Sequence, residues 1–249
     1  MLSSVCLVGH LARRQPNMIS IVIPTFNESK TGYLKLILTQ LALLDNAEVL
    51  VIDGGSTDGT LDIIKGFGAK VEMLPNSSRA ARLKMGIARS SGELILLHHP
   101  RSLLSADAIS SLRSLGEGNR GFWGGFSHKF DTQHPLLKFT SWYSNVIRCD
   151  RKSILYLDHC IFFDKELTEL ATLTPDVDIF EDTELSKIFS RHSNPVRCPE
   201  HSTTSAIRFV QNGIYRQALM NQFLKIGYLL KISHKTMNRL YEKGLGLNS

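Results

Sequence analysis

The sequence is poor in cysteine, with four in 249 residues, and the four lie far apart. Cys6, Cys149, Cys160 and Cys198 form no Cys-x-x-Cys pair, so neither a disulfide framework nor a structural zinc site is indicated. We therefore expect a protein that works in a reducing, cytoplasmic setting.

The sequence also lacks a long apolar run, and no stretch approaches the roughly 20 apolar residues that a membrane-spanning helix needs. Residues 2–12 are mildly apolar, but no basic residue precedes them, and Arg13 and Arg14 fall on the wrong side for a secretory signal. We expect residues 1–17 to be an N-terminal extension without regular structure.

Two glycine motifs that bind phosphate are missing as well. No Gly-x-Gly-x-x-Gly follows the first apolar run, and Gly-x-x-x-x-Gly-Lys-Ser/Thr does not occur in the sequence. The dinucleotide-binding and P-loop versions of an α/β fold are therefore disfavoured, and any phosphate group has to be held in another way.

What is present is an alternation of strand and helix patterns in a chain with 43% apolar residues, enough for one large α/β domain. Four short apolar runs are each followed by a helical pattern, as expected for βαβ units and a parallel sheet. The predicted strands are 19–23, 48–52, 69–74 and 93–98, and the predicted helices are 33–44, 58–66, 79–89 and 105–115.

The second half of the sequence changes character and predicts a mixed region. Strand patterns at 121–130 and 153–163 are joined by a helical stretch at 136–148, and a further helix is predicted from Glu181 to Arg191. Amphipathic helices are predicted at 211–230 and 235–244. We therefore expect one domain over residues 18–209 and a helical tail over residues 210–249.

The formal charge of +6 is concentrated in this tail, because residues 208–243 hold seven Lys or Arg and a single acid, Glu242. Such a tail suggests an anionic partner, either a membrane surface, a diphosphate or nucleic acid, although a solvated helical face is a common alternative. Nucleic acid is not expected, because no aromatic and basic stacking platform accompanies the charge.

The most informative stretch is residues 47–60, where a buried strand ends in Asp53, Gly54 and Gly55 and a helix-starting cluster follows. In open α/β sheets, ligands bind beyond the carboxyl ends of strands, and glycines let the backbone approach a bound group. Asp53 and Asp58 also suit a turn residue and a helix cap. From the residues alone, the two interpretations are about equal.

Three segments taken in order resemble the family 2 glycosyltransferases of the GT-A fold. They are Ser20 to Glu28 (SIVIPTFNE), Val51 to Thr60 (VIDGGSTDGT) and the pair Glu181-Asp182. The resemblance covers about residues 18–190, and the segments around Arg208 and Arg216 are similar to a bacterial subgroup of that family. It implies a Rossmann-like GT-A fold, with a mixed, mostly parallel sheet flanked by helices.

The resemblance implies a nucleotide-sugar donor, UDP- or GDP-linked, and a set of residues that bind it. Asp53 is expected to accept a charge-assisted hydrogen bond from the base, a stronger bond than one between neutral groups. Arg79 and Arg208 are expected to meet the diphosphate, although both also suit solvated cations. The strand-end loop is expected to line the base and ribose with Pro24, Thr25, Asn27 and Glu28.

The resemblance also implies the catalytic residues. Asp182 is expected to act as the general base that takes the acceptor proton, Glu181 to orient it or the acceptor, and Asp158 to lie on the acceptor side. Acids are favoured at a helix start by the macrodipole alone, so capping is the competing interpretation for Glu181 and Asp182.

The sequence departs from the family after the fourth predicted strand. Family members usually carry Asp-x-Asp or His-x-Asp there to hold Mg²⁺ or Mn²⁺, whereas this sequence has His98, His99 and Pro100. Three outcomes stay open: a metal held weakly through His98 and the diphosphate, metal-free catalysis in which Arg79, Arg101 and Arg208 neutralise the leaving group, or loss of catalysis.

The expected function is therefore that of an inverting glycosyltransferase acting on an acceptor hydroxyl of a lipid-linked or cell-envelope glycan. The alternative is a catalytically degenerate sugar-nucleotide-binding or scaffolding protein on the same fold. Apolar residues interleaved with Lys225, Lys231 and Lys235 fit a helix on an anionic membrane surface, and packing against the domain is the alternative. We expect a cytoplasmic protein, peripheral on the inner face of the membrane if the first interpretation holds.

Overall fold

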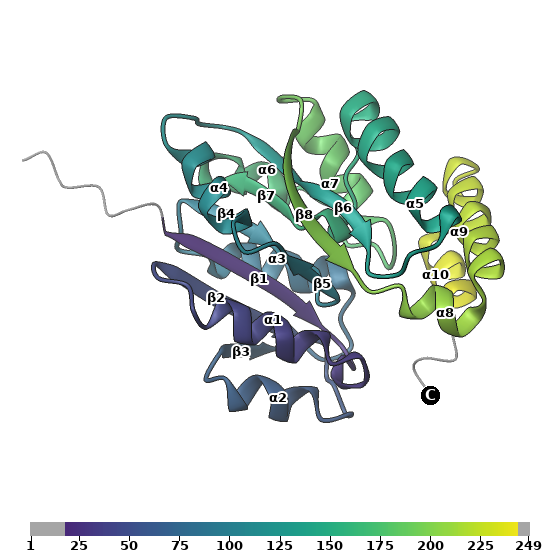
Figure 1. The fold of residues 1–249 in the computed structure, drawn as a ribbon, viewed down its shortest axis with the longest axis horizontal. Helices are drawn as coiled ribbons and strands as arrows, with labels where there is room; N and C mark the ends of the chain where they lie inside the picture. Colours follow the sequence, from purple (N-terminus) through teal and green to yellow (C-terminus); the bar gives the residue numbers. More distant parts are fainter. Residues whose placement is uncertain (1–17, 244–249) are drawn as a thin grey trace, which may run out of the picture.

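The computed structural model describes residues 18–243, so the predicted extension at 1–17 lies outside the described residues. Within this range, eight strands form one sheet in the order β3-β2-β1-β4-β7-β6-β8-β5 (Figure 1). The strands are β1 (Ile19–Thr25), β2 (Ala47–Asp53), β3 (Lys70–Met73), β4 (Leu94–Leu97), β5 (Ser102–Leu104), β6 (Trp123–Phe130), β7 (Ile161–Asp164) and β8 (Val196–Thr204).

The first four strands run parallel to one another, and the second half of the sheet is mixed. Strand β7 is antiparallel to β4 and β6, β6 is parallel to β8, and β5 is antiparallel to β8. Because β1 to β4 are parallel, their carboxyl ends lie at one edge of the sheet, where a ligand site is expected. This mixed α/β sheet confirms the fold class predicted from the sequence.

Helices cover both faces of the sheet, and four further segments within residues 18–243 are wound more loosely or more tightly than an α-helix. The α-helices are α1 (Tyr33–Leu41), α2 (Thr60–Gly66), α3 (Arg79–Arg89), α4 (Ala108–Gly116), α5 (Pro135–Trp142), α6 (Thr168–Thr172), α7 (Glu181–Ser190), α8 (Ile207–Asn212), α9 (Ile214–Leu229) and α10 (His234–Lys243). The π-helix is η2 (Tyr143–Asp150), and the 3₁₀ turns are η1 (Ser29–Thr31), η3 (Leu157–His159) and η4 (Lys165–Leu167).

Alternation along β1 shows why the sheet is covered on both faces. Ile21 and Ile23 belong to a core that includes residues of α1, α2 and α4, whereas Val22 between them belongs to a second core with residues of α3, α6 and α7. Successive side chains of a strand point to opposite faces, so an all-apolar run needs a helical layer on each side. All seven residues of β1 are buried.

The predicted strand at 153–163 is wrong over most of its length. Only its last three residues lie in β7, which continues to Asp164, and the residues before them form a loop and the turn η3. Side chains of α7 hold this loop in place of a strand ladder: Ser186 Oγ bonds both backbone groups of Leu155, and Asp182 accepts from the Leu157 N–H. The apolar residues of this loop are buried, and a run of buried apolar residues has the same sequence pattern as a strand.

The helix predicted at 136–148 is present but changes its winding. Pro135 occupies the first turn of α5, where its missing N–H costs nothing, and the α-helix passes into the π-helix η2 at Tyr143. Such wide turns are rare and often occur at functional sites. Here the π-helix carries Tyr143, Ser144 and Arg148 to the wall of the main cavity.

Candidate active site

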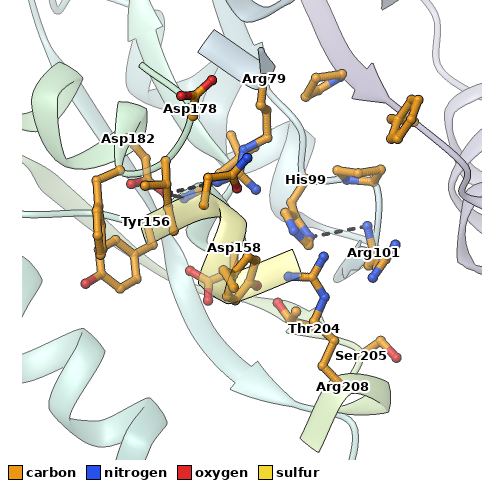
Figure 2. Close-up of a pocket in the computed structure, with 18 of the residues that line it drawn as sticks. Arg79, His99, Arg101, Tyr156, Asp158, Asp178, Asp182, Thr204, Ser205 and Arg208 are labelled. Atoms are coloured by element: carbon orange, nitrogen blue, oxygen red, sulfur yellow. Dashed lines mark hydrogen bonds and ion pairs between the residues drawn. The ribbon is translucent and has the colours of Figure 1, made fainter. Parts of the chain in front are cut away.

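The main cavity has a volume of 710 Å³ and opens at the carboxyl edge of the parallel strands. The loops after β1, β2 and β3 form one wall, and β6, η2, α7 and the C-terminal helices α8 to α10 form the other. Figure 2 shows Arg101 and Arg208 on one side of the cavity and Tyr156 and Asp182 on the other, with Asp158 and His99 between them. The cavity thus joins the two halves of the chain.

The donor-side wall depends on Asp53, which closes β2. Both of its carboxylate oxygens accept hydrogen bonds from the surrounding loops: Oδ1 from the backbone N–H groups of Gly55 and Ser56, and Oδ2 from the hydroxyls of Thr25 and Ser56. The side chain is fully buried and is not part of the cavity wall. Asp53 therefore shapes the loop in this structure, in place of the base contact expected from the sequence.

The loop after β1 carries the other residues expected to bind the donor. Pro24 and Glu28 line the cavity. Thr25 instead donates to Asp53, and Asn27, with a φ of 52°, accepts from the backbone N–H of Thr57 through its side-chain oxygen. Thr25 and Asn27 therefore join the two strand-end loops and contribute to the site through the backbone they hold.

Phe26, within the loop expected to line the base, and Arg82, which was not expected at the site, complete this wall. The Arg82 guanidinium lies 5.7 Å from the centre of the Phe26 ring and donates to the Thr25 carbonyl at 3.1 Å. A Cβ atom on Gly54 would lie 1.9 Å from Arg82 Nη1, so only glycine leaves room for this guanidinium. The group that lies close to the backbone of Gly54 is therefore the side chain of Arg82, whereas the sequence led us to expect a bound ligand there.

The segment after β4 places His99, and not His98, in the cavity. His98 is fully buried and is not among the residues that line the cavity, and burial lowers its pKa to about 4. His99 lines the cavity together with Pro100 and Arg101. Burial and the nearby charge of Arg79 hold the pKa of His99 well below its usual range, so its ring is neutral at pH 7. The expectation that His98 contacts the donor or a metal therefore needs correction.

The residues present do not fit a Mg²⁺ or Mn²⁺ site made of protein ligands. Hard cations prefer several oxygen ligands, and Pro100 stands where the family acid is expected. Within residues 18–243, no three His, Cys, Asp or Glu side chains come together in a way that could hold a metal ion. The next residue, Arg101, instead brings a guanidinium to the cavity, where its Nε donates to Glu28 at 2.6 Å.

Arg79, Glu181 and Asp182 come together where α3 and α7 begin. Ser78 caps α3 by accepting from the Ala81 N–H, which sets Arg79 at the first helical position. The Arg79 guanidinium bonds Glu181 through Nε, and its Nη2 lies 3.9 Å from Asp182 Oδ2. Asp182 lines the cavity, whereas Glu181 is almost fully buried behind it.

Asp182 is the acidic group whose pKa suits proton transfer. Burial, followed by the negative charge of Glu181, raises the pKa of Asp182 to about 7, against the opposite effect of Arg79. Its oxygens also accept from the backbone N–H groups of Leu157 and Thr183. The carboxyl group is thus fixed in orientation and half ionised near neutral pH, as a general base requires.

Asp158 and Arg208 both line the cavity. Asp158 is half-buried, its Oδ2 lies 3.5 Å from His128 Nε2, and its Oδ1 has no hydrogen-bond partner among residues 18–243. The Arg208 guanidinium lies 4.9 Å from the ring centre of Tyr241 on α10. An acid and a cation are therefore available on the second-half wall.

Three further cavity residues were not expected at the site from the sequence. Arg148 comes from η2 and Lys225 from α9, and Tyr156 lies in the loop that was mistaken for a strand. The cavity wall as a whole carries six cationic side chains and four carboxylates, namely Arg79, Arg82, Arg101, Arg148, Arg208 and Lys225 against Glu28, Asp158, Asp178 and Asp182. The only feature of the sequence that pointed to Arg148 and Lys225 as site residues was the general basic charge of their helices.

The fold and this site define a class of protein: an α/β domain with a cationic cavity and a tuned carboxylate at the carboxyl edge of its parallel strands. Residues 20–112 match the model of the family described as glycosyl transferase family 2. Together with the relatives and structures below, this match supports a family 2 glycosyltransferase, the family that the sequence motifs resemble.

Two curated relatives match part of the chain. One is the dolichyl N-acetyl-alpha-D-glucosaminyl phosphate 3-beta-D-2,3-diacetamido-2,3-dideoxy-beta-D-glucuronosyltransferase of Methanococcus voltae, 37% identical over 90 residues, which are 32% of this chain and 28% of the relative. The other is glycosyltransferase AglJ of Haloferax volcanii, 30% identical over 105 residues, 41% of this chain and 34% of the relative. The chain thus spans about a third of these relatives or less.

Solved structures share the fold at low sequence identity. TarS of S. aureus in complex with UDP-GlcNAc has a TM-score of 0.57 at 20% identity, covering 76% of this chain and 56% of that one. Glucosyl-3-phosphoglycerate synthase of Mycobacterium tuberculosis, in complex with Mn²⁺, UDP and glucosyl-3-phosphoglycerate, has a TM-score of 0.54 at 19% identity, covering 76% and 70%. These likenesses establish the GT-A fold of this chain.

Proposed function

We propose that the protein transfers a sugar from a nucleotide-diphosphate donor to an acceptor hydroxyl, with inversion at the anomeric carbon. The observation that carries the proposal is the carboxyl group of Asp182, raised in pKa and facing a cavity lined by Arg79, Arg101 and Arg208. A base next to a cluster of cations suits a reaction that removes a proton and releases a diphosphate.

The transfer takes place in one displacement. The acceptor hydroxyl gives its proton to Asp182 as its oxygen forms a bond to the anomeric carbon. The bond from that carbon to the diphosphate oxygen breaks, and the nucleoside diphosphate leaves with the electron pair. Glu181, held by Arg79, keeps the Arg79 guanidinium beside Asp182 and so positions both groups. Attack from the side opposite to the leaving group inverts the configuration.

The donor fits the wall made by the first half of the chain. Phe26 gives an apolar surface for a base, and Gly55 and Thr57, which are not buried, line the wall beside it. Structures of the same fold were solved with UDP-GlcNAc and with GDP-Man, so both uridine and guanosine donors are candidates. We propose that Asp53 supports this wall from behind.

We propose that the arginines neutralise the diphosphate and take the part that a divalent metal plays in other family members. Two similar structures contain Mn²⁺, whereas the side chains after β4 in this chain lack the oxygen ligands for it. The test is UDP and GDP binding with and without Mn²⁺. We expect the affinity to change less than about threefold with Mn²⁺ and to fall about tenfold or more in Arg101→Gln, since a charge-assisted bond is lost. A strict requirement for Mn²⁺ contradicts the proposal.

The central test is turnover of Asp182→Asn over a panel of UDP- and GDP-sugars, with total membrane lipids supplied as acceptors. We expect release of the nucleoside diphosphate to fall about 10²- to 10⁴-fold, which is the usual contribution of a general base. Asp178→Asn is the control, since Asp178 is exposed at the same cavity. Near-normal turnover of Asp182→Asn overturns the assignment of the base.

One result favours the alternative, a sugar-nucleotide-binding or scaffolding protein. If the wild-type protein binds a nucleotide sugar but turns over none of the panel, the cavity binds without catalysis. The tuned pKa of Asp182 argues against this alternative, because a carboxyl group used only for capping needs no burial next to a second acid.

We further propose that the acceptor is lipid-linked and that the protein works at an anionic membrane surface in the cytoplasm. One curated relative is named for a dolichyl phosphate-linked acceptor, and another is an archaeal glycosyltransferase, so a restriction to bacteria stays a prediction. Among the described residues, no helix is both long and apolar enough to span a membrane. The exposed side chains of α9 support peripheral contact of this helix with the membrane surface.

A further inference from the structure

The second-half wall of the cavity holds two cations that the donor chemistry does not use. Arg148 comes from the π-helix η2, and its guanidinium lies 4.1 Å from the ring centre of Tyr156 and 5.7 Å from that of Tyr143. Lys225 comes from α9, beside Leu224, which is buried against the domain. Stacking on Tyr156 fixes the planar Arg148 group at the wall.

Arg148 and Lys225 both line the same cavity, and Lys225 carries the effect of the neighbouring positive charge. Burial and the positive charge of Arg148 lower the pKa of Lys225 to about 8, and the partial attraction of Asp158 does not reverse this. Lys225 makes no hydrogen bond or ion pair within residues 18–243. Like charges brought together in a partly buried wall are unfavourable unless an anion joins them.

Their place in the cavity separates them from two of the three donor arginines, Arg101 and Arg208 (Figure 2). Arg148 stacks on Tyr156, which lies with Asp182 on the side of the cavity opposite Arg101 and Arg208 (Figure 2). An anion bound between Arg148 and Lys225 would therefore sit beside the proposed base and away from the diphosphate of the donor. The group that reaches the base is the acceptor.

We propose that Arg148 and Lys225 form a subsite for an anionic group of the phosphate class on the acceptor, so that the substrate is a phosphate-bearing alcohol. This inference rests on the proposed function, because it assigns the second-half wall to the acceptor. The aromatic rings of Tyr143 and Tyr156 line the same wall and offer an apolar surface to the carbon part of such a molecule.

The experiment measures binding of octyl phosphate, glycerol 3-phosphate and octyl glucoside by calorimetry, with the donor side saturated with UDP or GDP. We expect wild-type protein to bind at least one of the phosphates about tenfold or more tightly than the neutral octyl glucoside. We expect Lys225→Met and Arg148→Gln to weaken phosphate binding by about 10- to 100-fold, the loss typical of one charge-assisted hydrogen bond. Preference for octyl phosphate indicates a lipid-linked acceptor, and preference for glycerol 3-phosphate a soluble one; both support the subsite.

The control is Lys235→Met, which removes an exposed lysine from the same tail and should leave phosphate binding unchanged. The nucleotide affinity of each variant is measured in parallel, and we expect it to change less than about twofold. Unchanged phosphate binding in Lys225→Met overturns the inference, and so does an equal loss of nucleotide and phosphate binding. If no nucleotide binds to the wild type, the proposed function fails, whereas the phosphate titrations without nucleotide still show whether the anion subsite exists.

Discussion

The buried carboxyl group of Asp182 links the proposed chemistry to stability at the scale of one residue. Its pKa is about 7 in the folded protein and about 3.9 in an unfolded chain, so the folded state binds the proton more tightly. The stability that this proton contributes is fully present below about pH 4 and is lost as the pH rises through about 7. The ionised carboxylate of Asp182 therefore lowers the stability of the folded protein in the pH range where it can act as a base.

The corresponding prediction concerns the melting temperature of Asp182→Asn relative to wild type. The amide cannot ionise, so the difference in Tm between variant and wild type should shift in favour of the variant as the pH rises from 4.5 to 8. A constant loss is expected as well, because one backbone N–H that Asp182 accepts from will face the amide NH₂. Scanning calorimetry at several pH values measures both terms.

Asp178→Asn serves as the control for this prediction, since an exposed acid should give the same difference in Tm at each pH. If the difference for Asp182→Asn is also independent of pH, then Asp182 is not raised in pKa. In that case the case for a base poised near neutrality fails together with the stability prediction.

The sequence identified Asp53 and the histidine pair as site positions, but not the direction of their side chains. Asp53 lies at a strand end as predicted, yet its orientation depends on four donors that only the folded loops bring together. His98 and His99 follow a strand whose two faces are both buried, and neighbours in an extended chain point in opposite directions. Nothing in the local sequence says which of the two faces the cavity.

At the scale of elements, Gly86 sets the distance between α3 and the sheet. A Cβ atom at this position would lie 2.2 Å from a methyl carbon of Val22, which is fully buried in β1. Because Val22 is β-branched and enclosed, it cannot turn aside, and the helix has to move. Arg79 at the start of the same helix would move with it.

We therefore predict that Gly86→Ala lowers stability by about 1–3 kcal/mol, as overpacking of a core does, although alanine favours a helix by about 1 kcal/mol over glycine. Gly66→Ala in α2 is the matched control, since nothing lies within 4 Å of its Cβ position, and it should stabilise the protein. Urea denaturation compares the two variants. If Gly86→Ala were more stable than wild type, α3 and β1 would have space for the added methyl group, and the prediction would be wrong.

Strands and helices were predicted well from the sequence where each strand is followed by a helix. They were predicted less well where a strand pairs with another strand that lies far away in the sequence. The predicted strands 19–23 and 48–52 match β1 and β2 closely. Strands β5 and β8 were not predicted, because β8 carries few apolar residues and pairs with β6, which lies about 70 residues earlier. Such ladders depend on a partner that local patterning does not reveal.

At the scale of the whole molecule, the C-terminal helices are part of the site. Tyr228 of α9 packs on Phe180 with ring centres 4.8 Å apart, and His234 bonds the Ile179 carbonyl at 2.7 Å. Phe180 has a left-handed backbone, with a φ of 67°, directly before the acids of α7. The tail thus holds the strained loop that leads to Asp182, and truncating the tail is expected to disturb donor and acceptor sites together.

One interpretation of the tail sequence was that the tail packs against the domain. This packing explains the residues on only one side of α9. Leu224 is buried and Lys225 faces the cavity, so these two cannot contact a membrane. The outward side carries an apolar stripe at helical spacing, formed by Tyr215, Leu219, Phe223 and Ile226 and continued by Leu230 directly after the helix, and each of these residues is more than half exposed. In Figure 1, α9 lies at one end of the molecule, beside α5.

This stripe, flanked by the exposed cations Arg216 and Lys231, matches a helix that lies on an anionic bilayer. We predict that the double variant Leu219→Asp and Phe223→Asp weakens binding to phosphatidylglycerol vesicles at least tenfold in a sedimentation assay, since two apolar side chains that would enter the bilayer are replaced by negative charges. Nucleotide affinity should stay within about twofold, because both side chains point away from the cavity. Leu36→Asp and Leu43→Asp, at exposed positions on and after α1, form the control, which should bind vesicles like wild type. Equal binding of both double variants would show that α9 does not carry the membrane contact.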